Sequence, residues 1–170
     1  MDLGFFQLRA WRKGDEESLV RHANNPNVAR HLRDRFPHPY TLTDARSWIR
    51  HARSQDPITD FAIVVNGEAA GGIGFELQRD VARRSAELGY WLGEAHWGRG
   101  IVTEGVRALT RLMFSNFDLN RIYSTVFDGN PASVRVLEKA GFTFEGRMRK
   151  AAVKGGRTLD VLLYALLKEP

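Results

Sequence analysis

The sequence predicts an α+β domain built around a mixed β-sheet. Segments with strand-like alternation and segments with apolar residues at helical spacing follow one another in the order β-α-α-α-β-β-β-α-β-α-β-β. The 170 residues are enough to bury a core without metals or disulfides, and 43% of them are hydrophobic. No repeat, low-complexity tract or linker divides the chain, so we expect a single domain over residues 1–170.

A strand and a helix are predicted near the N-terminus. Residues 5–12 alternate apolar and polar side chains with a period of two, which is typical of a strand. Asp15 is a suitable N-cap for the helix that follows, whose inner side carries Leu19 and Ala23. The Asn-Asn-Pro sequence at residues 24–26 ends this helix.

Two more helices are expected before the next strand. A short one continues through residues 31–32, and a Pro-His-Pro loop at residues 37–39 follows it. Thr43 is the predicted N-cap of the third helix, over residues 44–53. The residues of this helix that we expect to face inward are Trp48 and Ile49.

The pattern then changes to that of strands. Residues 60–65 and 69–77 are expected to form a hairpin, because the Asn-Gly pair at residues 66–67 favours a tight hairpin turn. A further strand is predicted over residues 86–92.

Helices and strands alternate in the rest of the chain. A glycine-rich turn leads into a long helix, residues 121–127 form a strand, and Asn130 begins a short helix that stops at Gly141. Two strands, residues 142–145 and 159–167, close the chain. The long helix has an apolar face formed by Val102, Val106, Leu109, Leu112 and Met113.

Composition excludes several kinds of site. The sequence has no cysteine, which rules out disulfides, cysteine-based zinc sites and a cysteine nucleophile. Its histidines show no metal-ligand spacing, so no metal is expected. No segment has the apolar length of a signal peptide or a membrane span, and we therefore expect a soluble cytoplasmic protein without a membrane partner.

The chain is basic, with 25 Lys and Arg against 20 Asp and Glu and a net charge of +5. This charge fits either an ordinary solubilising surface or attraction to an anionic ligand such as a phosphorylated cofactor. The basic residues are scattered, and no aromatic-basic RNA signature accompanies them. Nucleic acid is therefore not the expected partner.

The segment ELGYWLGEAHWGRGIVTE, residues 87–104, carries the most informative chemistry. A strand leads through Gly98-Arg99-Gly100 directly into a helix, whose first backbone N–H groups have no intrahelical partner. Glycines allow the backbone to approach a ligand closely, so the turn predicts a phosphate or diphosphate site. The Walker pattern is missing, and a dinucleotide fingerprint would need glycine where Thr103 stands. The alternative is a strand-to-helix corner that binds nothing.

Two more segments, NPASVRVLEKAGF at residues 130–142 and FEGRMR at residues 144–149, complete a family resemblance. Together with the glycine-rich segment they resemble the GCN5-related N-acetyltransferases (GNAT). They look closest to the branch that acetylates ribosomal-protein N-termini (RimJ/RimL-like) and to its small-molecule relatives. PHPYTLTDARSWI, residues 37–49, is similar to the substrate-side arm of that branch, so the resemblance covers nearly the whole chain. It implies a mostly antiparallel sheet that is splayed at a bulge and has helices on both faces.

The resemblance implies acetyl-CoA as co-substrate. In this family the amides of the glycine-rich turn bind the coenzyme A diphosphate, and the end of the preceding strand pairs with the pantetheine arm. A backbone N–H near that strand end would polarise the thioester carbonyl. The second motif adds contacts to the pantetheine and the 3′-phosphate. The cofactor-binding residues implied are Trp91, Leu92, Gly93, Gly98, Arg99, Gly100, Ile101, Val102, Thr103, Asn130, Ser133, Arg135 and Lys139.

Several of these residues have a simpler interpretation or depart from the family pattern. Asn130 before a proline is also a good helix N-cap, and the charges of Arg135 and Lys139 also suit a solvated helix face. The pattern Q/R-x-x-G-x-G/A is only partly kept, with Trp97 in its first position and Val102 in its last.

The resemblance also implies catalytic roles. Glu87 is the first choice for the general base that prepares the amine, with a structural ion pair as the alternative, and Asp160 is the second choice. Leu137 stands where many relatives have a tyrosine that acts as general acid. We therefore expect Ser133 to stabilise the departing thiolate and Asn130 to contact the amine's surroundings. A thiol with a pKa of about 8.5 also leaves tolerably without an acid.

The implied reaction is direct transfer of acetyl to a primary amine in a ternary complex. The acceptor is a protein N-terminus or a small molecule. Ribosomal-branch members carry a glutamate where this chain has Ala152, so that substrate does not follow from the resemblance alone. A catalytically silent acyl-CoA-binding sensor or scaffold is the alternative function, and a homodimer is common among similar proteins.

Overall fold

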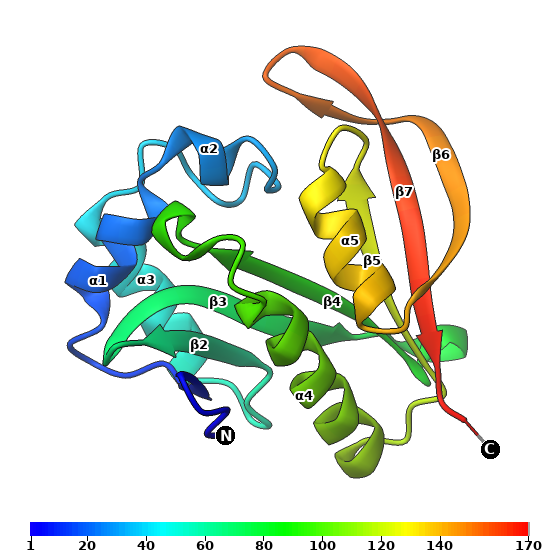
Figure 1. Ribbon diagram of the computed structural model, residues 1–170, viewed down its shortest axis with the longest axis horizontal. Coiled ribbons are helices and arrows are strands. Elements are labelled where there is room, and N and C mark those ends of the chain that lie inside the picture. The colour runs from blue at the N-terminus through cyan, green and yellow to red at the C-terminus, as the bar shows by residue number, and fades with distance from the viewer. Residues whose placement is uncertain (170) are drawn as a thin grey trace. The chain divides into compact units, whose positions relative to one another are not determined.

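The predicted order of elements is confirmed. The structure is a computed structural model that describes residues 1–169, and Figure 1 labels its elements along the chain. The elements are β1 (Phe6–Ala10), α1 (Glu16–Ala23), α2 (Pro26–Ala29), α3 (Leu42–Arg53), β2 (Asp60–Val65), β3 (Glu68–Leu77), η1 (Asp80–Ala82), β4 (Ser85–Leu92), η2 (Glu94–His96), α4 (Ile101–Asn116), β5 (Arg121–Phe127), α5 (Pro131–Lys139), β6 (Thr143–Lys154) and β7 (Arg157–Leu167), where η marks a 3₁₀ helix.

The strands form a mixed, mostly antiparallel seven-stranded sheet, as predicted. Their order is β1-β2-β3-β4-β5-β7-β6. The β1–β2, β2–β3, β5–β7 and β6–β7 pairs are antiparallel, whereas β4 and β5 are parallel from Ser85–Arg121 to Glu87–Tyr123. Past this register, the Ser124 hydroxyl donates to the Leu88 carbonyl at 3.0 Å. A side-chain hydroxyl thus bonds to a strand carbonyl just past the end of the parallel register.

The chain divides into two compact units. Unit 1 consists of Met1–Gly74 and Tyr90–Gly105, and unit 2 of Phe75–Gly89 and the described residues from Val106 onward. Strands β3 and β4 and helix α4 contribute residues to both units. None of the helices in residues 1–169 has the length and apolar character needed to cross a membrane.

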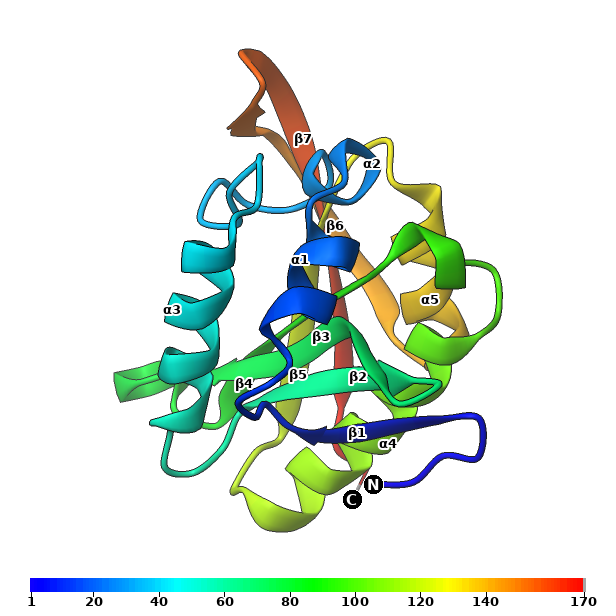
Figure 2. The same cartoon turned by 90° about the vertical axis from the view of Figure 1, so that its left-hand side faces the viewer.

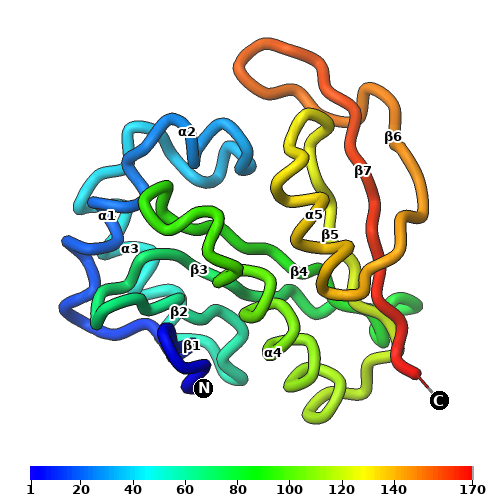
Figure 3. The backbone as a smooth tube through the Cα atoms, in the orientation of Figure 1, coloured from blue at the N-terminus to red at the C-terminus, as the bar shows by residue number. Residues whose placement is uncertain are grey.

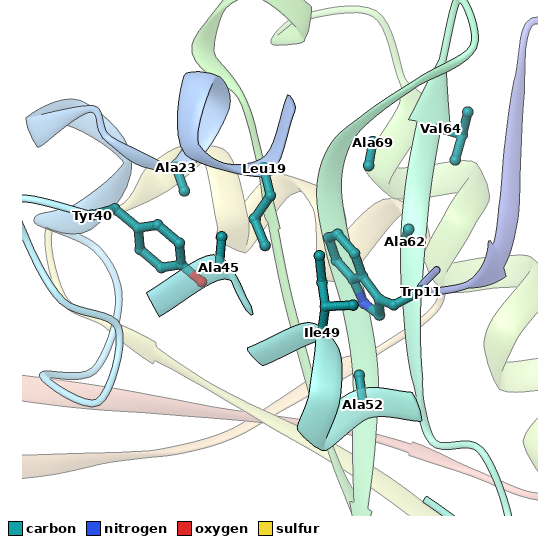
Figure 4. Packing of buried hydrophobic residues seen from close by; sticks show 10 residues of the cluster. All are labelled: Trp11, Leu19, Ala23, Tyr40, Ala45, Ile49, Ala52, Ala62, Val64 and Ala69. Atoms are coloured by element: carbon teal, nitrogen blue, oxygen red, sulfur yellow. The ribbon is translucent and has the colours of Figure 1, made fainter. Parts of the chain in front are cut away.

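Unit 1 has its own hydrophobic core, which α1 and α3 help to form. The two helices lie side by side in Figure 2. Figure 4 shows Leu19 of α1 and Ile49 of α3 pointing toward Trp11, which follows β1, and Ala62 of β2. All four side chains are at most 2% exposed. The full cluster is Trp11, Leu19, Ala23, Tyr40, Ala45, Ile49, Ala52, Ala62, Val64 and Ala69.

Asp15 occupies the N-cap position of α1, as predicted, but its side chain makes no capping bond. Its two carboxylate oxygens accept instead from the guanidinium nitrogens of Arg9, both at 2.7 Å. A third bond comes from the Arg12 amide at 3.0 Å. The carboxylate therefore joins β1 to the start of α1.

The predicted N-cap of α3 was wrong. The cap is Thr41, whose hydroxyl accepts from the Asp44 amide while the Asp44 carboxylate accepts from the Thr41 amide. This reciprocal capping box satisfies two backbone donors at once, which a cap at Thr43 does not achieve. The second helix is also shorter than expected and ends at Ala29.

Unit 2 ends in a hairpin much longer than predicted. We expected strands over residues 142–145 and 159–167, but β6 runs to Lys154 and β7 begins at Arg157. The turn between them is Gly155-Gly156, with φ values of 55° and 74°. Figure 3 shows this hairpin as the orange and red end of the chain. The side chains of β6 are exposed on both faces, so the strand lacks the alternation that sequence patterns detect.

The prediction of which α4 residues form its apolar face was only partly correct. Val106, Leu109 and Met113 are buried as predicted, but Ile101 is buried in the first turn rather than Val102. The helix therefore turns Val102 partly toward solvent at the end that follows the glycine-rich turn.

Candidate active site

The glycine-rich turn has the backbone conformation that its sequence predicts. Gly98 and Gly100 have φ values of 75° and 77°, and α4 begins at the next residue. A Cβ added at either glycine would meet no atom within 4 Å. Glycine is therefore required here by backbone conformation and not by lack of space. The green segment between β4 and α4 in Figure 1 contains this turn.

The start of α4 presents backbone amides. The first helical bond of α4 runs from the Glu104 amide to the Gly100 carbonyl at 3.1 Å, so the amides of Ile101, Val102 and Thr103 precede it. As whole residues Ile101 and Thr103 are only 1% and 8% exposed, so their side chains pack into the protein and do not face a ligand. The positive end of the helix dipole adds to these amides, so this turn has the chemistry of an anion site.

The segment leading to the turn is fixed by long-range hydrogen bonds. The Glu94 carboxylate accepts from the side-chain amide of Asn25 at 2.7 Å and from that of Asn27 at 3.0 Å. These bonds hold η2 against the first residues of α2, and they lower the pKa of Glu94. Sequence reasoning missed this contact because the partners lie 69 and 67 residues apart.

The end of β4 lies closely against β3. The Gly93 amide donates to the Ala70 carbonyl at 2.8 Å. A Cβ on Gly71 would be 2.5 Å from the Trp91 carbonyl oxygen and 3.0 Å from the Leu92 Cα. Because Gly71 has no Cβ, the backbone of β3 can lie this close to the end of β4. Gly71 therefore helps to position residues 91–93, which we expect to bind pantetheine.

The Trp91 indole lies over the glycines of β3. A Cβ on Gly72 would be 2.8 Å from its Nε1 atom. The Phe36 ring meets the Trp91 ring edge-on, with 5.3 Å between centroids, and the Tyr40 ring lies 4.9 Å from Phe36. Tyr40 of the predicted substrate-side arm thus packs on Phe36, the residue just before that arm, and Phe36 contacts the strand end within unit 1.

Two histidines, His22 of α1 and His96 of η2, pack against each other beside Gly93. The His22 and His96 ring centroids are 5.2 Å apart, and a Cβ on Gly93 would be 2.6 Å from His22 Nδ1. Burial lowers the pKa of His22, and a positive charge on His96 lowers it further. Burial, followed by the charge of Arg99, also lowers the pKa of His96. Both imidazoles are therefore neutral at neutral pH.

Glu87, the candidate base, lies in unit 2 at the end of the parallel register. Its Oε1 atom accepts from the Thr125 hydroxyl of β5 at 3.1 Å, and its side chain is partly buried. This contact holds the carboxylate on the side where β4 faces β5. Its proposed role as a base remains a prediction.

The N-terminal cap of α5 is built as the sequence predicts. The Asn130 side-chain oxygen accepts from the Ser133 amide at 3.2 Å, with Pro131 as the first helical residue. Leu137, one turn further on, is 0% exposed and belongs to the core of unit 2. Arg135 and Lys139 are exposed on the same helix. Their contacts with a cofactor remain predictions.

Asp160, the second candidate base, belongs to an ion-pair network. Its carboxylate accepts from the Lys150 amide at 2.8 Å and from the Arg147 guanidinium at 3.0 Å. These contacts lower the pKa of Asp160, the Lys150 bond having the larger effect. Arg147 also pairs with Asp128, two residues before Asn130. Asp160 therefore has a structural role that joins the long hairpin to the loop before α5.

Comparison with known proteins places this geometry in a family. A family model described as an acetyltransferase (GNAT) domain matches residues 6–143 and so extends over parts of both units. An uncharacterised N-acetyltransferase of Bacillus licheniformis, p20, is 31% identical over 95% of this chain and 92% of its own length. The ribosomal-protein-serine acetyltransferase of Escherichia coli is 33% identical over 62% of this chain and 58% of its own length.

A solved structure shows the same fold. The ribosomal alpha-N-protein acetyltransferase RimL, in complex with coenzyme A, has a TM-score of 0.84 and 24% identity, and the match covers 96% of this chain and 94% of that one. At this identity the likeness concerns the fold.

Proposed function

Because this chain belongs to the GNAT acetyltransferase family, we propose that it transfers acetyl from acetyl-CoA to a primary amine by direct attack in a ternary complex. One observation carries the proposal. Gly98 and Gly100, with φ values of 75° and 77°, form the turn that leads into α4. The main-chain amides that precede the first helical bond of α4 can there hold a diphosphate. We further propose that residues 1–170 act as one cytoplasmic domain.

In this proposal each part of the cofactor is bound by a different segment. The amides of residues 98–103 bind the diphosphate. Trp91, Leu92 and Gly93 pair with pantetheine through backbone groups other than the Gly93 amide, which donates to the Ala70 carbonyl. Asn130 and Ser133 contact the pantetheine arm, and Arg135 and Lys139 the 3′-phosphate.

The chemistry needs a neutral amine, an oxyanion donor and a departing thiolate. Glu87 takes the proton from the amine, directly or through water. A backbone amide at the end of β4 stabilises the tetrahedral intermediate. The thiolate then leaves with the help of the Ser133 hydroxyl, since Leu137 can neither donate a proton nor reach solvent. Acetyl forms an amide bond to nitrogen while its bond to sulfur breaks.

For the acceptor we propose the amino terminus of a protein. The support is the relative named ribosomal-protein-serine acetyltransferase, together with Tyr40 of the substrate-side arm, whose ring packs on Phe36, which in turn contacts Trp91. An α-amine with a pKa of about 8 needs less help from a base than a lysine amine near about 10.4. A small-molecule amine is the second candidate acceptor.

The test is a thiol-release assay combined with calorimetry. Since the chain has no cysteine, a thiol reagent reports coenzyme A release without background from the protein. Serine- and alanine-initiated peptides are compared with their N-terminally blocked forms and with polyamines and amino sugars. Turnover of free-amine peptides alone supports the proposal, and turnover of small amines alone changes the acceptor. Acetyl-CoA binding without turnover of any amine would identify a sensor, and absence of binding would refute the cofactor site.

Steady-state kinetics test the direct route. Intersecting lines in a double-reciprocal plot are expected for a ternary complex, whereas parallel lines would require an acetylated enzyme intermediate. Sedimentation at several protein concentrations tests whether the enzyme is a homodimer.

A further inference from the structure

The Trp97 side chain bonds back to the strand that precedes it. Its indole N–H donates to the Leu92 carbonyl at 2.7 Å. Leu92 is the last residue of β4, and Trp97 is the last residue before Gly98. The bond therefore closes a loop between the strand end and the glycine-rich turn, both within unit 1.

Other contacts shape the middle of this loop. The His96 amide donates to the Gly93 carbonyl at 2.9 Å, and the Trp97 amide to the Glu94 carbonyl at 3.1 Å. These bonds form η2 but do not reach back to β4. The Trp97 indole ties the far end of η2 to the strand.

Burial of the ring is incomplete, so packing alone does not account for this residue. As whole residues, Trp97 is 43% exposed and Leu92 is 5% exposed. The polar end of the indole is the part that makes a specific contact. A carbonyl oxygen has two lone pairs, so Leu92 can accept a second bond from a ligand while Trp97 holds it.

We infer that Trp97 is a positioning residue that fixes the separation between the end of β4 and the diphosphate turn. The inference rests on the proposed function, in which the strand end binds pantetheine and the turn binds diphosphate. A ligand that uses both places gains affinity when their separation is already correct. A ligand that uses only the turn gains nothing from this bond.

Two ligands distinguish these cases. Coenzyme A and ADP share adenosine and a 5′-diphosphate, but ADP lacks the pantetheine arm and the 3′-phosphate of coenzyme A. Two variants separate the N–H from the ring. Trp97→Phe keeps an aromatic ring without a donor, and Trp97→Gln replaces the ring with a flexible side chain that carries N–H groups.

The experiment measures the Kd of coenzyme A by calorimetry and the inhibition constant of ADP against acetyl-CoA. We expect Trp97→Phe to weaken coenzyme A binding about three- to tenfold, the usual effect of one hydrogen bond, with the ADP constant unchanged. We expect Trp97→Gln to recover at least half of the loss on a logarithmic scale. Thermal unfolding of each variant checks that the fold is intact.

Three results would overturn the inference. Equal losses for coenzyme A and ADP would mean that Trp97 only maintains the turn. Unchanged coenzyme A binding in Trp97→Phe would mean that the bond does not position the strand end. Wild-type protein that binds coenzyme A but is not inhibited by ADP would show that the turn does not hold a diphosphate on its own. Failure of wild-type protein to bind coenzyme A would instead refute the proposed function.

Discussion

Replacing Gly100 with alanine tests the conformational requirement of the diphosphate turn. The glycine has a φ of 77°, and an added Cβ meets no atom within 4 Å. The cost of Gly100→Ala is therefore conformational, about 1–2 kcal/mol for an L-residue in the left-handed region. A chain of this size loses about 2–4 °C of Tm per kcal/mol, so a turn that keeps its shape lowers the Tm by about 2–8 °C.

The Gly100→Ala variant can also relieve the backbone strain if the turn changes its conformation. The amides of residues 101–103 would then no longer converge, and acetyl-CoA affinity would fall, with about tenfold corresponding to 1.4 kcal/mol. We expect Gly100→Ala to lower the Tm, the affinity for acetyl-CoA, or both. The two losses, expressed as free energies, should add up to the conformational cost of the substitution. Differential scanning calorimetry and titration calorimetry measure the two quantities.

Gly146→Ala is the matched control. Its added Cβ also meets no atom within 4 Å, and its φ is not in the left-handed region. It adds the same methyl group without the strain, so the Tm should stay within about 1–2 °C. If Gly100→Ala behaves like Gly146→Ala in both Tm and acetyl-CoA affinity, the reasoning about the turn is wrong.

Three further predictions concern the base, the core and the two partly buried histidines. Glu87→Gln should lower kcat by about 10²-fold or more while the Kd of acetyl-CoA stays constant, and an unchanged pH–rate profile would exclude Glu87 as the base. Ile49→Ala should reduce the free energy of unfolding, measured by urea denaturation, by about 2–5 kcal/mol, because Ile49 is 2% exposed within the unit 1 core. A loss below about 1 kcal/mol would contradict this packing. Since folding lowers the pKa of both His22 and His96, the unfolded chain binds more protons at mildly acidic pH. Their contribution to stability is present above the unfolded pKa of about 6.5 and is lost as pH falls from there toward the folded pKa values. Thermal unfolding across this range should show a weaker pH dependence in His22→Gln, and an unaltered slope would count against a neutral, partly buried imidazole.

Local signals in the sequence predicted much of the fold. The Asn-Gly pair at residues 66–67 has positive φ at both positions, 51° and 84°, as a hairpin turn requires. Asn130 with Pro131 formed the expected cap. These cases succeeded because the signal and the structure that it specifies lie within four residues.

Two errors involved local signals that were present. Thr41 is followed three residues later by Asp44, which is the spacing of a capping box, so the correct cap could have been read from the sequence. The Gly155-Gly156 turn could likewise have indicated a hairpin. It was missed because the exposed β6 shows no apolar alternation.

The candidate site was only partly accessible from sequence. The glycine-rich turn was predicted with its conformation, since positive φ and helix entry are local properties. The Glu94 contacts with Asn25 and Asn27 and the Trp97 bond to Leu92 depend on how the chain folds back on itself. No spacing rule identifies such partners.

The close approach of β3 to the end of β4 means that β3 helps to shape the proposed active site without contacting a ligand. Gly71 touches no proposed ligand, yet even one methyl group there would collide with the Trp91 carbonyl at 2.5 Å and push the strand end aside. We therefore expect substitutions at Gly71 to reduce activity as strongly as substitutions in the glycine-rich turn. A substitution at Gly71 would therefore move the end of β4 without changing any side chain that is proposed to face a ligand.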